Sequence, residues 1–269
     1  MKKDLKVAIV QTKVPSSKTV GEGQIKKLVK EILKKPVDMV GLPEDCVTDD
    51  YAEIKSGYNA LEFLSSVAKE NNVYLFGATA VWENGGFYNR GFLFDRSGKL
   101  VGHHDKIVLT PLEVKRGIIP GNSLDIFETE FGQIAILVCK DSFHRYAAWF
   151  FDKLRNAGVD IILIPSYSLN VSKRSIELWV DSLKALAKWF DMYVVASGTI
   201  GANGTDFPSF GHSLIICPNR GILAEGSYDK EEILRAILDV KSLEEIRYTY
   251  GSKWQPNDVP KVEIKIYEN

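Results

Sequence analysis

The sequence predicts an α/β fold, in which two mixed sheets pack as a four-layer αββα sandwich with helices on the outer faces. Short apolar strands alternate with amphipathic helices along the chain. The order strand, helix, strand, helix and then a run of strands occurs twice. Strands such as residues 134–138 ("IAILV") are continuously apolar, which is typical of strands covered on both faces. No low-complexity linker separates the two halves, so we expect residues 1–269 to form one domain.

The first half of the chain, up to residue 106, contains the first copy of this order. We expect its strands at residues 6–12, 38–45, 73–82, 86–95 and 99–106, with helices at residues 22–35 and 59–72. In the first of these helices Ile25, Leu28, Val29 and Ile32 share one face. Turn residues at 84–86 and in "DRSGK" predict hairpin connections between the last three strands.

The second half repeats the order and ends in a tail of different texture. We expect strands at residues 123–129, 133–141, 160–168, 192–200, 210–218 and 221–227, with helices at residues 142–158 and 175–190. The helix at 142–158 carries apolar residues near helical spacing and stops at Gly158. The tail comprises residues 251–269. In it, Val262, Ile264 and Ile266 alternate with polar residues, as in an exposed edge strand that can pair with another strand.

Composition excludes several classes of partner. The 34 basic and 35 acidic residues give a net charge of −1, which offers no electrostatic case for binding nucleic acid or an anionic membrane. The apolar runs are too short to span a bilayer, and the first residues lack the pattern of a signal peptide, so we expect a cytoplasmic protein. The three cysteines match neither a disulfide framework nor a metal motif, so we expect reduced thiols.

Three residues of complementary chemistry stand at the ends of predicted strands. Glu44 ends "MVGLPE", Lys106 ends "KLVGHHDK" and Cys139 ends "IAILVC". Ligands bind at the carboxyl ends of strands in α/β sheets, so these side chains can converge. Cys139 would also lie just before a helix N-terminus, whose dipole favours a thiolate. Taken singly, each residue also fits a plainer role: a structural thiol, a helix-capping acid or a solvated lysine.

Three motifs in order resemble the nitrilase superfamily of carbon-nitrogen hydrolases. These are "GLPED", "HHDKIVLTPLE" and "ILVCKDSF", and the stretch "FYNRGFLFDRSGKLVGHHDK" is also similar to the family pattern. The resemblance extends from residue 6 to about residue 240 and favours its amidase-like branch. It implies an αββα sandwich, a triad of Glu44, Lys106 and Cys139, and no metal or organic cofactor. It also implies that Glu113 is a second acid beside the triad.

The chemistry of amide cleavage gives each of these residues a separate task. Cys139 would attack the carbonyl carbon and form a thioester, and Glu44, with a pKa raised by apolar neighbours, would carry protons as general acid and base. Lys106 and the backbone N–H of Lys140 would stabilise the oxyanion. Glu113 would hold Lys106 charged and in place.

The residues after the cysteine bear on the substrate. Nitrilases usually follow it with Trp and Glu, whereas Lys140 and Asp141 stand here, so the sequence favours amides or N-carbamoyl compounds over nitriles. We expect Lys140, His144, Ser166 and Tyr167 to line the substrate site. Together with Arg116 and Arg145, Lys140 and His144 could favour a substrate that carries a carboxylate, although such loop charges can equally be solvated.

Other interpretations remain open at this level. The thioester could pass its acyl group to an amine instead of water, or the fold could serve regulation or binding without turnover. A protease-like pair of Cys139 and His144 is less favourable because helix geometry would separate them. Cys46 and Cys217 are expected to be structural. The aromatic segment 143–154 and the tail predict a homodimer or larger oligomer.

Overall fold

The computed structural model describes residues 2–172, 174–202 and 207–250. The strands are β1 (Leu5–Lys13), β2 (Met39–Gly41), β3 (Tyr74–Glu83), β4 (Gly86–Phe94), β5 (Leu100–Asp105), β6 (Ile126–Thr129), β7 (Gly132–Ile136), β8 (Ile161–Ser166), β9 (Tyr193–Gly201), β10 (Ser209–Phe210), β11 (Leu214–Cys217), β12 (Gly221–Glu225) and β13 (Glu232–Leu238). The α-helices are α1 (Lys18–Ile32), α2 (Tyr51–Lys55), α3 (Ala60–Asn71), α4 (Pro111–Lys115), α5 (Ala147–Asn156), α6 (Arg174–Trp189) and α7 (Leu243–Tyr250), and the 3-10 turns are η1 (Cys139–Ser142) and η2 (Val240–Ser242). The predicted α/β class is confirmed.

The strands of the two halves run in matching directions. In the first half β1, β2 and β3 are parallel, β4 is antiparallel to β3, and β5 is antiparallel to β4. In the second half β7, β8 and β9 are parallel, with β6 antiparallel to β7 and β11 antiparallel to β9. Strand β13 was not predicted from the sequence, and it lies antiparallel to β1.

Strand β1 joins the two halves. Its last residues pair in parallel with β9, at Thr12 with Thr199 and Lys13 with Ile200. The pairings therefore connect all the strands into one thirteen-stranded mixed sheet. The expectation of two separate sheets in four layers is not confirmed in that detail, because this shared pairing makes the strands continuous.

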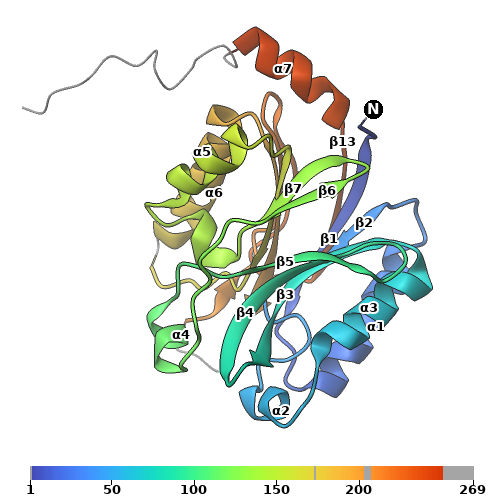
Figure 1. Ribbon diagram of the computed structural model, residues 1–269, viewed down its shortest axis with the longest axis vertical. Helices are drawn as coiled ribbons and strands as arrows, with labels where there is room; N and C mark the ends of the chain where they lie inside the picture. The colour runs from blue at the N-terminus through green and yellow to red at the C-terminus, as the bar shows by residue number, and fades with distance from the viewer. Residues whose placement is uncertain (1, 173, 203–206, 251–269) are drawn as a thin grey trace, which may run out of the picture.

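Three apolar clusters hold the elements together. One lies between the two halves and includes Val7, Phe76, Ile136 and Val195. The other two fix α1 and α3 on the first half and α5 and α6 on the second half. Figure 1 shows these helix pairs on opposite sides of the strands. Each large apolar side chain buried in this way contributes roughly 1.5–3 kcal/mol of transfer free energy.

Strand direction decides where polar side chains can meet. Because β1, β2, β3, β5, β7, β8 and β9 all run the same way, their carboxyl ends lie at one edge of the sheet. The segments that follow β2, β5, β7 and β8 therefore start from a common edge. These segments carry Glu44, Lys106, Cys139 and Tyr167.

The helix predicted at residues 142–158 is shorter than expected. The α-helix begins at Ala147, and the 3-10 turn η1 precedes it at Cys139–Ser142. The apolar spacing read as helical from residue 143 is thus shared between a turn and a helix. The tail at residues 251–269 lies outside the described residues. Among the described helices none is long and apolar enough to cross a membrane.

Candidate active site

Glu44 is a buried acid held by polar partners. It lies in a turn after β2 and is 2% exposed. Its Oε1 accepts hydrogen bonds from Lys106 Nζ at 2.8 Å and Asn89 Nδ2 at 2.6 Å. Its Oε2 accepts from the backbone amide of Tyr167 at 2.6 Å. The expected apolar surroundings of this carboxyl are therefore wrong, because its oxygens face donors from three other segments.

Lys106 is buried between two carboxylates. Its Nζ lies 2.8 Å from Glu44 Oε1 and 2.9 Å from Glu113 Oε1, and the residue is 1% exposed. Burial lowers the pKa of this ammonium, but Glu44, Cys139 and Glu113 outweigh burial and leave the pKa well above its usual value. Lys106 is therefore charged throughout the neutral pH range.

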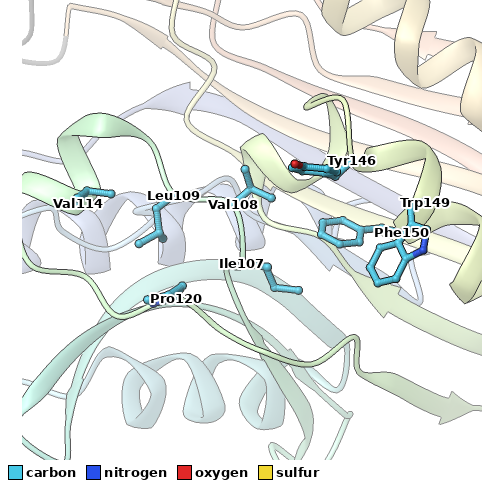
Figure 2. A pocket seen from close by; sticks show the side chains of 8 residues that line it. All are labelled: Ile107, Val108, Leu109, Val114, Pro120, Tyr146, Trp149 and Phe150. Atoms are coloured by element: carbon cyan, nitrogen blue, oxygen red, sulfur yellow. The ribbon is translucent and has the colours of Figure 1, made fainter.

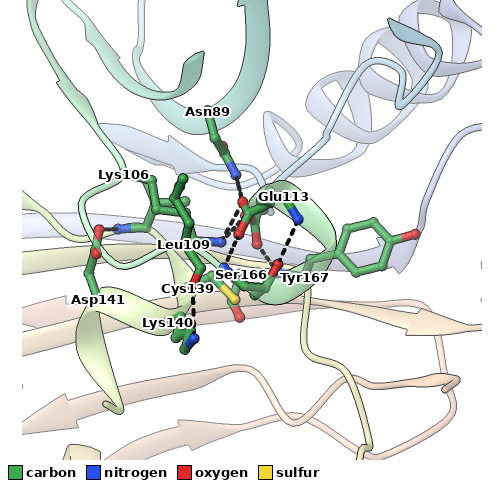
Figure 3. Close-up of polar contacts among 12 residues, drawn as sticks. Asn89, Lys106, Leu109, Glu113, Cys139, Lys140, Asp141, Ser166 and Tyr167 are labelled. Atoms are coloured by element: carbon green, nitrogen blue, oxygen red, sulfur yellow. Dashed lines mark hydrogen bonds and ion pairs between the residues drawn. The ribbon is translucent and has the colours of Figure 1, made fainter. Parts of the chain in front are cut away.

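Glu113 is fixed by the helix that carries it. It lies in the first turn of α4, where its Oε2 accepts from the Thr110 amide at 2.7 Å and its own amide donates to Thr110 Oγ1 at 3.2 Å. Asn89 Nδ2 donates to Glu113 Oε1 at 2.7 Å. Burial raises the pKa of Glu113, but Lys106 and these hydrogen bonds outweigh it and lower the pKa. Figure 3 shows Asn89, Lys106 and Glu113 converging on one point.

Cys139 lies beside this cluster as a protonated thiol. Burial, and then Glu44, raise its pKa to about 12, against the opposing charge of Lys106 and a hydrogen bond with Ser166. The expected thiolate at a helix N-terminus is therefore wrong, because α5 begins only at Ala147 and burial dominates. The residue adopts a left-handed backbone, with φ of 48°, which non-glycine residues rarely do outside functional or strained turns.

Asp141 ties the cysteine turn to the lysine segment. Its carboxylate accepts from the amides of Val108 at 2.6 Å, Ile107 at 3.2 Å and Val138 at 3.2 Å. His104 Nε2 lies 3.2 Å from the same carboxylate, and His104 Nδ1 lies 3.4 Å from Asp125. One buried side chain thus fixes the chain on both sides of Cys139 and just after Lys106.

The predicted substrate residues fall into two groups. Ser166 ends β8 next to Cys139, and the Tyr167 amide binds Glu44 while its ring extends away from the polar cluster (Figure 3). In contrast, the side-chain ammonium of Lys140 donates a hydrogen bond to the backbone carbonyl of Leu109 at 2.8 Å. His144 packs against Tyr146, at 5.1 Å between ring centres, and burial, Lys140 and Arg145 lower its pKa.

Two polar residues of the site were not predicted as members of it. Asn89 bridges Glu44 and Glu113, and the "FYNRG" stretch that carries part of the resemblance was the signal available for it. Asp45 follows Glu44 and is buried, yet its Oδ1 has no hydrogen-bond partner among the described residues. No sequence signal distinguished it from a turn residue. Within the same residues, no three His, Cys, Asp or Glu side chains are grouped as metal ligands.

An apolar hollow lies beside the site, behind the segment that follows Lys106. It measures about 840 Å³. It is lined by Ile107, Val108, Leu109, Val114, Pro120, Tyr146, Trp149 and Phe150 (Figure 2). Because Glu44, Lys106, Cys139 and Glu113 are absent from its lining, this hollow is distinct from the polar cluster.

Comparison with known proteins decides the family. The sequence pattern of the carbon-nitrogen hydrolases matches residues 6–248. The chain belongs to the carbon-nitrogen hydrolase family. The predicted resemblance to the amidase-like branch of the nitrilase superfamily is thereby confirmed, and the chain is an amidase-type hydrolase.

Individual relatives cover nearly the whole chain. The omega-amidase NIT2-B of Xenopus laevis is 27% identical, over 94% of this chain and 95% of the relative. The omega-amidase NIT2 of Mus musculus is 27% identical, over 90% of this chain and 91% of the relative.

Solved structures of other proteins have the same fold as this chain. Nit3 of Saccharomyces cerevisiae, a member of branch 10 of the nitrilase superfamily, has a TM-score of 0.79 at 22% identity, over 94% of this chain and 96% of its own. A carbon-nitrogen hydrolase of Helicobacter pylori G27 has a TM-score of 0.82 at 20% identity, over 92% of this chain and 93% of its own.

Proposed function

We propose that this enzyme hydrolyses the carbon-nitrogen bond of a small, non-peptide amide or N-carbamoyl compound through a thioester on Cys139. The observation that carries the proposal is the burial of the Cys139 thiol beside the hydrogen-bonded pair of Lys106 and Glu44. The relatives named omega-amidases support an amide as the substrate.

Acylation begins with a neutral thiol. Because the pKa of Cys139 is about 12 in the empty site, the thiol must lose its proton as it attacks, and Glu44 is the base within reach. The sulfur forms a bond to the carbonyl carbon, and the carbonyl electron pair moves to oxygen. When the carbon-nitrogen bond breaks, Glu44 returns the proton to the departing nitrogen, which leaves as ammonia or an amine.

In deacylation Glu44 acts first as a base and then as an acid. Glu44 removes a proton from water as the water oxygen attacks the thioester carbon. The carbon-sulfur bond then breaks, the carboxylic acid is released, and the proton returns to the Cys139 sulfur. No redox step or further co-reactant is needed.

Lys106 acts through charge in both tetrahedral intermediates. Its ammonium and the backbone N–H of Lys140 stabilise the oxyanion, and one such donor is commonly worth roughly 3–4 kcal/mol. Glu113 keeps Lys106 protonated and oriented through the 2.9 Å contact. Ser166 and Tyr167 line the substrate site, as their places beside Cys139 and Glu44 favour.

A substrate screen and a covalent label test this function together. Amides, ω-amides and N-carbamoyl compounds are assayed for ammonia release, and a slow substrate is expected to leave one adduct on Cys139 by peptide mapping. Cys139→Ala is expected to abolish release while the unfolding curve stays unchanged. Hydroxylamine trapping separates acyl transfer from hydrolysis. A label on Cys46 or Cys217, or turnover by the alanine variant, overturns the assignment.

We also propose a four-layer arrangement, a cytoplasmic location and a homodimer. The three apolar clusters support four αββα layers, and the free state of all three cysteines supports a cytoplasmic setting. The exposed rings of Tyr146 and Trp149 on and before α5 support a homodimer through this helix. Light scattering tests it: a monomer at micromolar concentration contradicts the dimer, and an unchanged dimer after removal of residues 251–269 excludes a contribution of the tail.

A further inference from the structure

Asp45 is a buried carboxyl group with no evident structural task. It follows Glu44 directly and is 6% exposed. Its Oδ1 has no hydrogen-bond partner within the described part of the chain, whereas buried carboxylates normally have several. Its backbone is left-handed, with φ of 51°. A buried acid with an unsatisfied oxygen in a left-handed turn costs stability, and such costs are concentrated at functional sites.

The surroundings of Asp45 are acidic. Burial first, and then the carboxyl groups of Glu44, Asp49 and Glu113, raise its pKa well above the usual value, and Lys106 opposes them. Lys106 is already bound by Glu44 at 2.8 Å and Glu113 at 2.9 Å. Glu44 and Glu113 thus share this ammonium, and no salt bridge of Asp45 is found within the described residues.

Arg116 is a second cation of this region, and it acts on Asp49 and on the phenol of Tyr51. Arg116 lowers the pKa of Asp49, against the larger effect of burial, and lies 5.0 Å from the ring centre of Tyr51. After burial, Asp45 raises the pKa of the phenols of Tyr51 and Tyr167, so its carboxyl lies near both side chains. At Tyr167, after burial, Asp45, Asp49 and Glu44 raise the pKa of the phenol, and Arg116 opposes them with a smaller effect. This excess of acids disfavours a substrate carboxylate, although Arg116 and Lys140 made one plausible from the sequence.

We propose that Asp45, together with Asp49, is the subsite for an ammonium group carried by the substrate, so that the enzyme prefers amides with a short, positively charged chain. This inference rests on the proposed function. Asp45 follows Glu44 directly, and Glu44, Glu113 and Lys106 all act on its carboxyl, so we expect a short chain of a few methylene groups between the ammonium and the scissile carbonyl. On binding, the carboxylate of Asp45 pairs with the ammonium, and because its pKa is raised in the empty site, pairing favours release of a proton to solvent.

Three amides that differ only at the far end test the subsite. We compare γ-aminobutyramide, valeramide and glutaramate, which end in ammonium, methyl and carboxylate. In the wild type kcat/KM is expected to fall in that order. Asp45→Asn keeps the side-chain shape and tolerates a left-handed backbone, and it is expected to lower the ammonium-to-methyl ratio of kcat/KM by about tenfold or more. Asp50→Asn makes the same charge change on the exposed N-cap of α2 and is expected to keep the ratio.

A wild-type preference for glutaramate, or an unchanged ratio in Asp45→Asn, overturns the subsite. An equal loss on all three amides also overturns it and assigns Asp45 to the positioning of Glu44.

A binding measurement separates failure of the subsite from failure of the amidase function. Cys139→Ala protein is titrated by calorimetry with butylammonium chloride and, separately, with sodium butanoate. The ammonium is expected to bind about tenfold tighter, with proton release seen as a dependence of the heat on buffer ionisation, and Asp45→Asn is expected to remove both. If none of the amides is hydrolysed but this pattern holds, only the reaction is wrong. If amides are hydrolysed but the ammonium does not bind in this way, only the subsite is wrong.

Discussion

The turns that carry Glu44 and Cys139 have similar backbones, but the aspartate in one turn is fully hydrogen-bonded and the aspartate in the other is not. Each follows a parallel strand, and each contains a left-handed residue, Asp45 or Cys139 itself. Asp141 in the cysteine turn accepts hydrogen bonds from Ile107, Val108 and Val138. Asp45 in the glutamate turn leaves Oδ1 without a partner within the described residues. The difference indicates that one acid builds the site and the other is kept for a ligand.

The largest effect is expected from the acids that contact Lys106. Glu44→Gln removes the proton carrier and is expected to lower kcat by about 100- to 10,000-fold, with acylation and deacylation both lost. Glu113→Gln keeps an oxygen for Lys106 and is expected to retain part of the acylation. Mass spectrometry of the acyl-enzyme, together with steady-state ammonia release, measures both steps. Equal residual activities in the two variants would contradict this division of tasks.

The second effect is on stability, in the cysteine turn. Asp141→Asn replaces one carboxylate oxygen by an NH₂ group that faces backbone donors, and it weakens the contact with His104. We expect a loss of about 2–3 kcal/mol in the free energy of unfolding. Urea denaturation measures it, with Asp50→Asn as the matched exposed change. A loss no larger than that of the control would show that Asp141 does not hold the turn.

Much of the site could be predicted because it depends on strand order. Glu44, Lys106 and Cys139 follow strands that the apolar pattern reveals, and strands that run in one direction end at one edge. The quoted motifs then allowed the family to be named. The role of Asn89 could not be found in this way, because it lies inside β4 and reaches both acids only through the pairing of β4 with β3 and β5.

Other errors came from properties that only tertiary contacts determine. The periodicity after Cys139 could not reveal that a 3-10 turn precedes α5, since Phe143, which follows this turn, packs against Trp179 of α6 as a helical residue would. The pKa of Cys139 is dominated by burial, which no local pattern measures. From the sequence, the charges of Lys140 and Arg116 could either meet a substrate carboxylate or be solvated, whereas Lys140 binds the carbonyl of Leu109 and Arg116 binds the phenol of Tyr51.

The third effect is a pH dependence centred on His104. Burial lowers its pKa, but hydrogen bonds with Asp125 and Asp141 outweigh burial and raise the pKa to about 9. A base whose folded pKa is raised contributes stability that is complete below its unfolded pKa, near 6.5, and is lost as the pH rises through the folded value. We expect the difference in unfolding free energy between wild type and His104→Gln to shrink from pH 6.5 to above pH 9. A difference that is constant over this range would show that the charge of His104 does not stabilise the turn.

The smallest effect is expected at Asp45, with a sign opposite to that at Asp141. Burial, then Glu44, Asp49 and Glu113, raise the pKa of Asp45 in the folded state, while the unfolded carboxyl ionises near pH 4. Wild type therefore loses stability as the pH rises above about 4, because only the unfolded state releases this proton. Asp45→Asn has no proton to release, so it is expected to be more stable than wild type at pH 7 and nearly equal to it below pH 4. Urea denaturation at the two pH values, run beside Asp141→Asn, checks the sign. If both substitutions destabilise at pH 7, Asp45 has a structural partner in solution, and the contrast between the two turns fails.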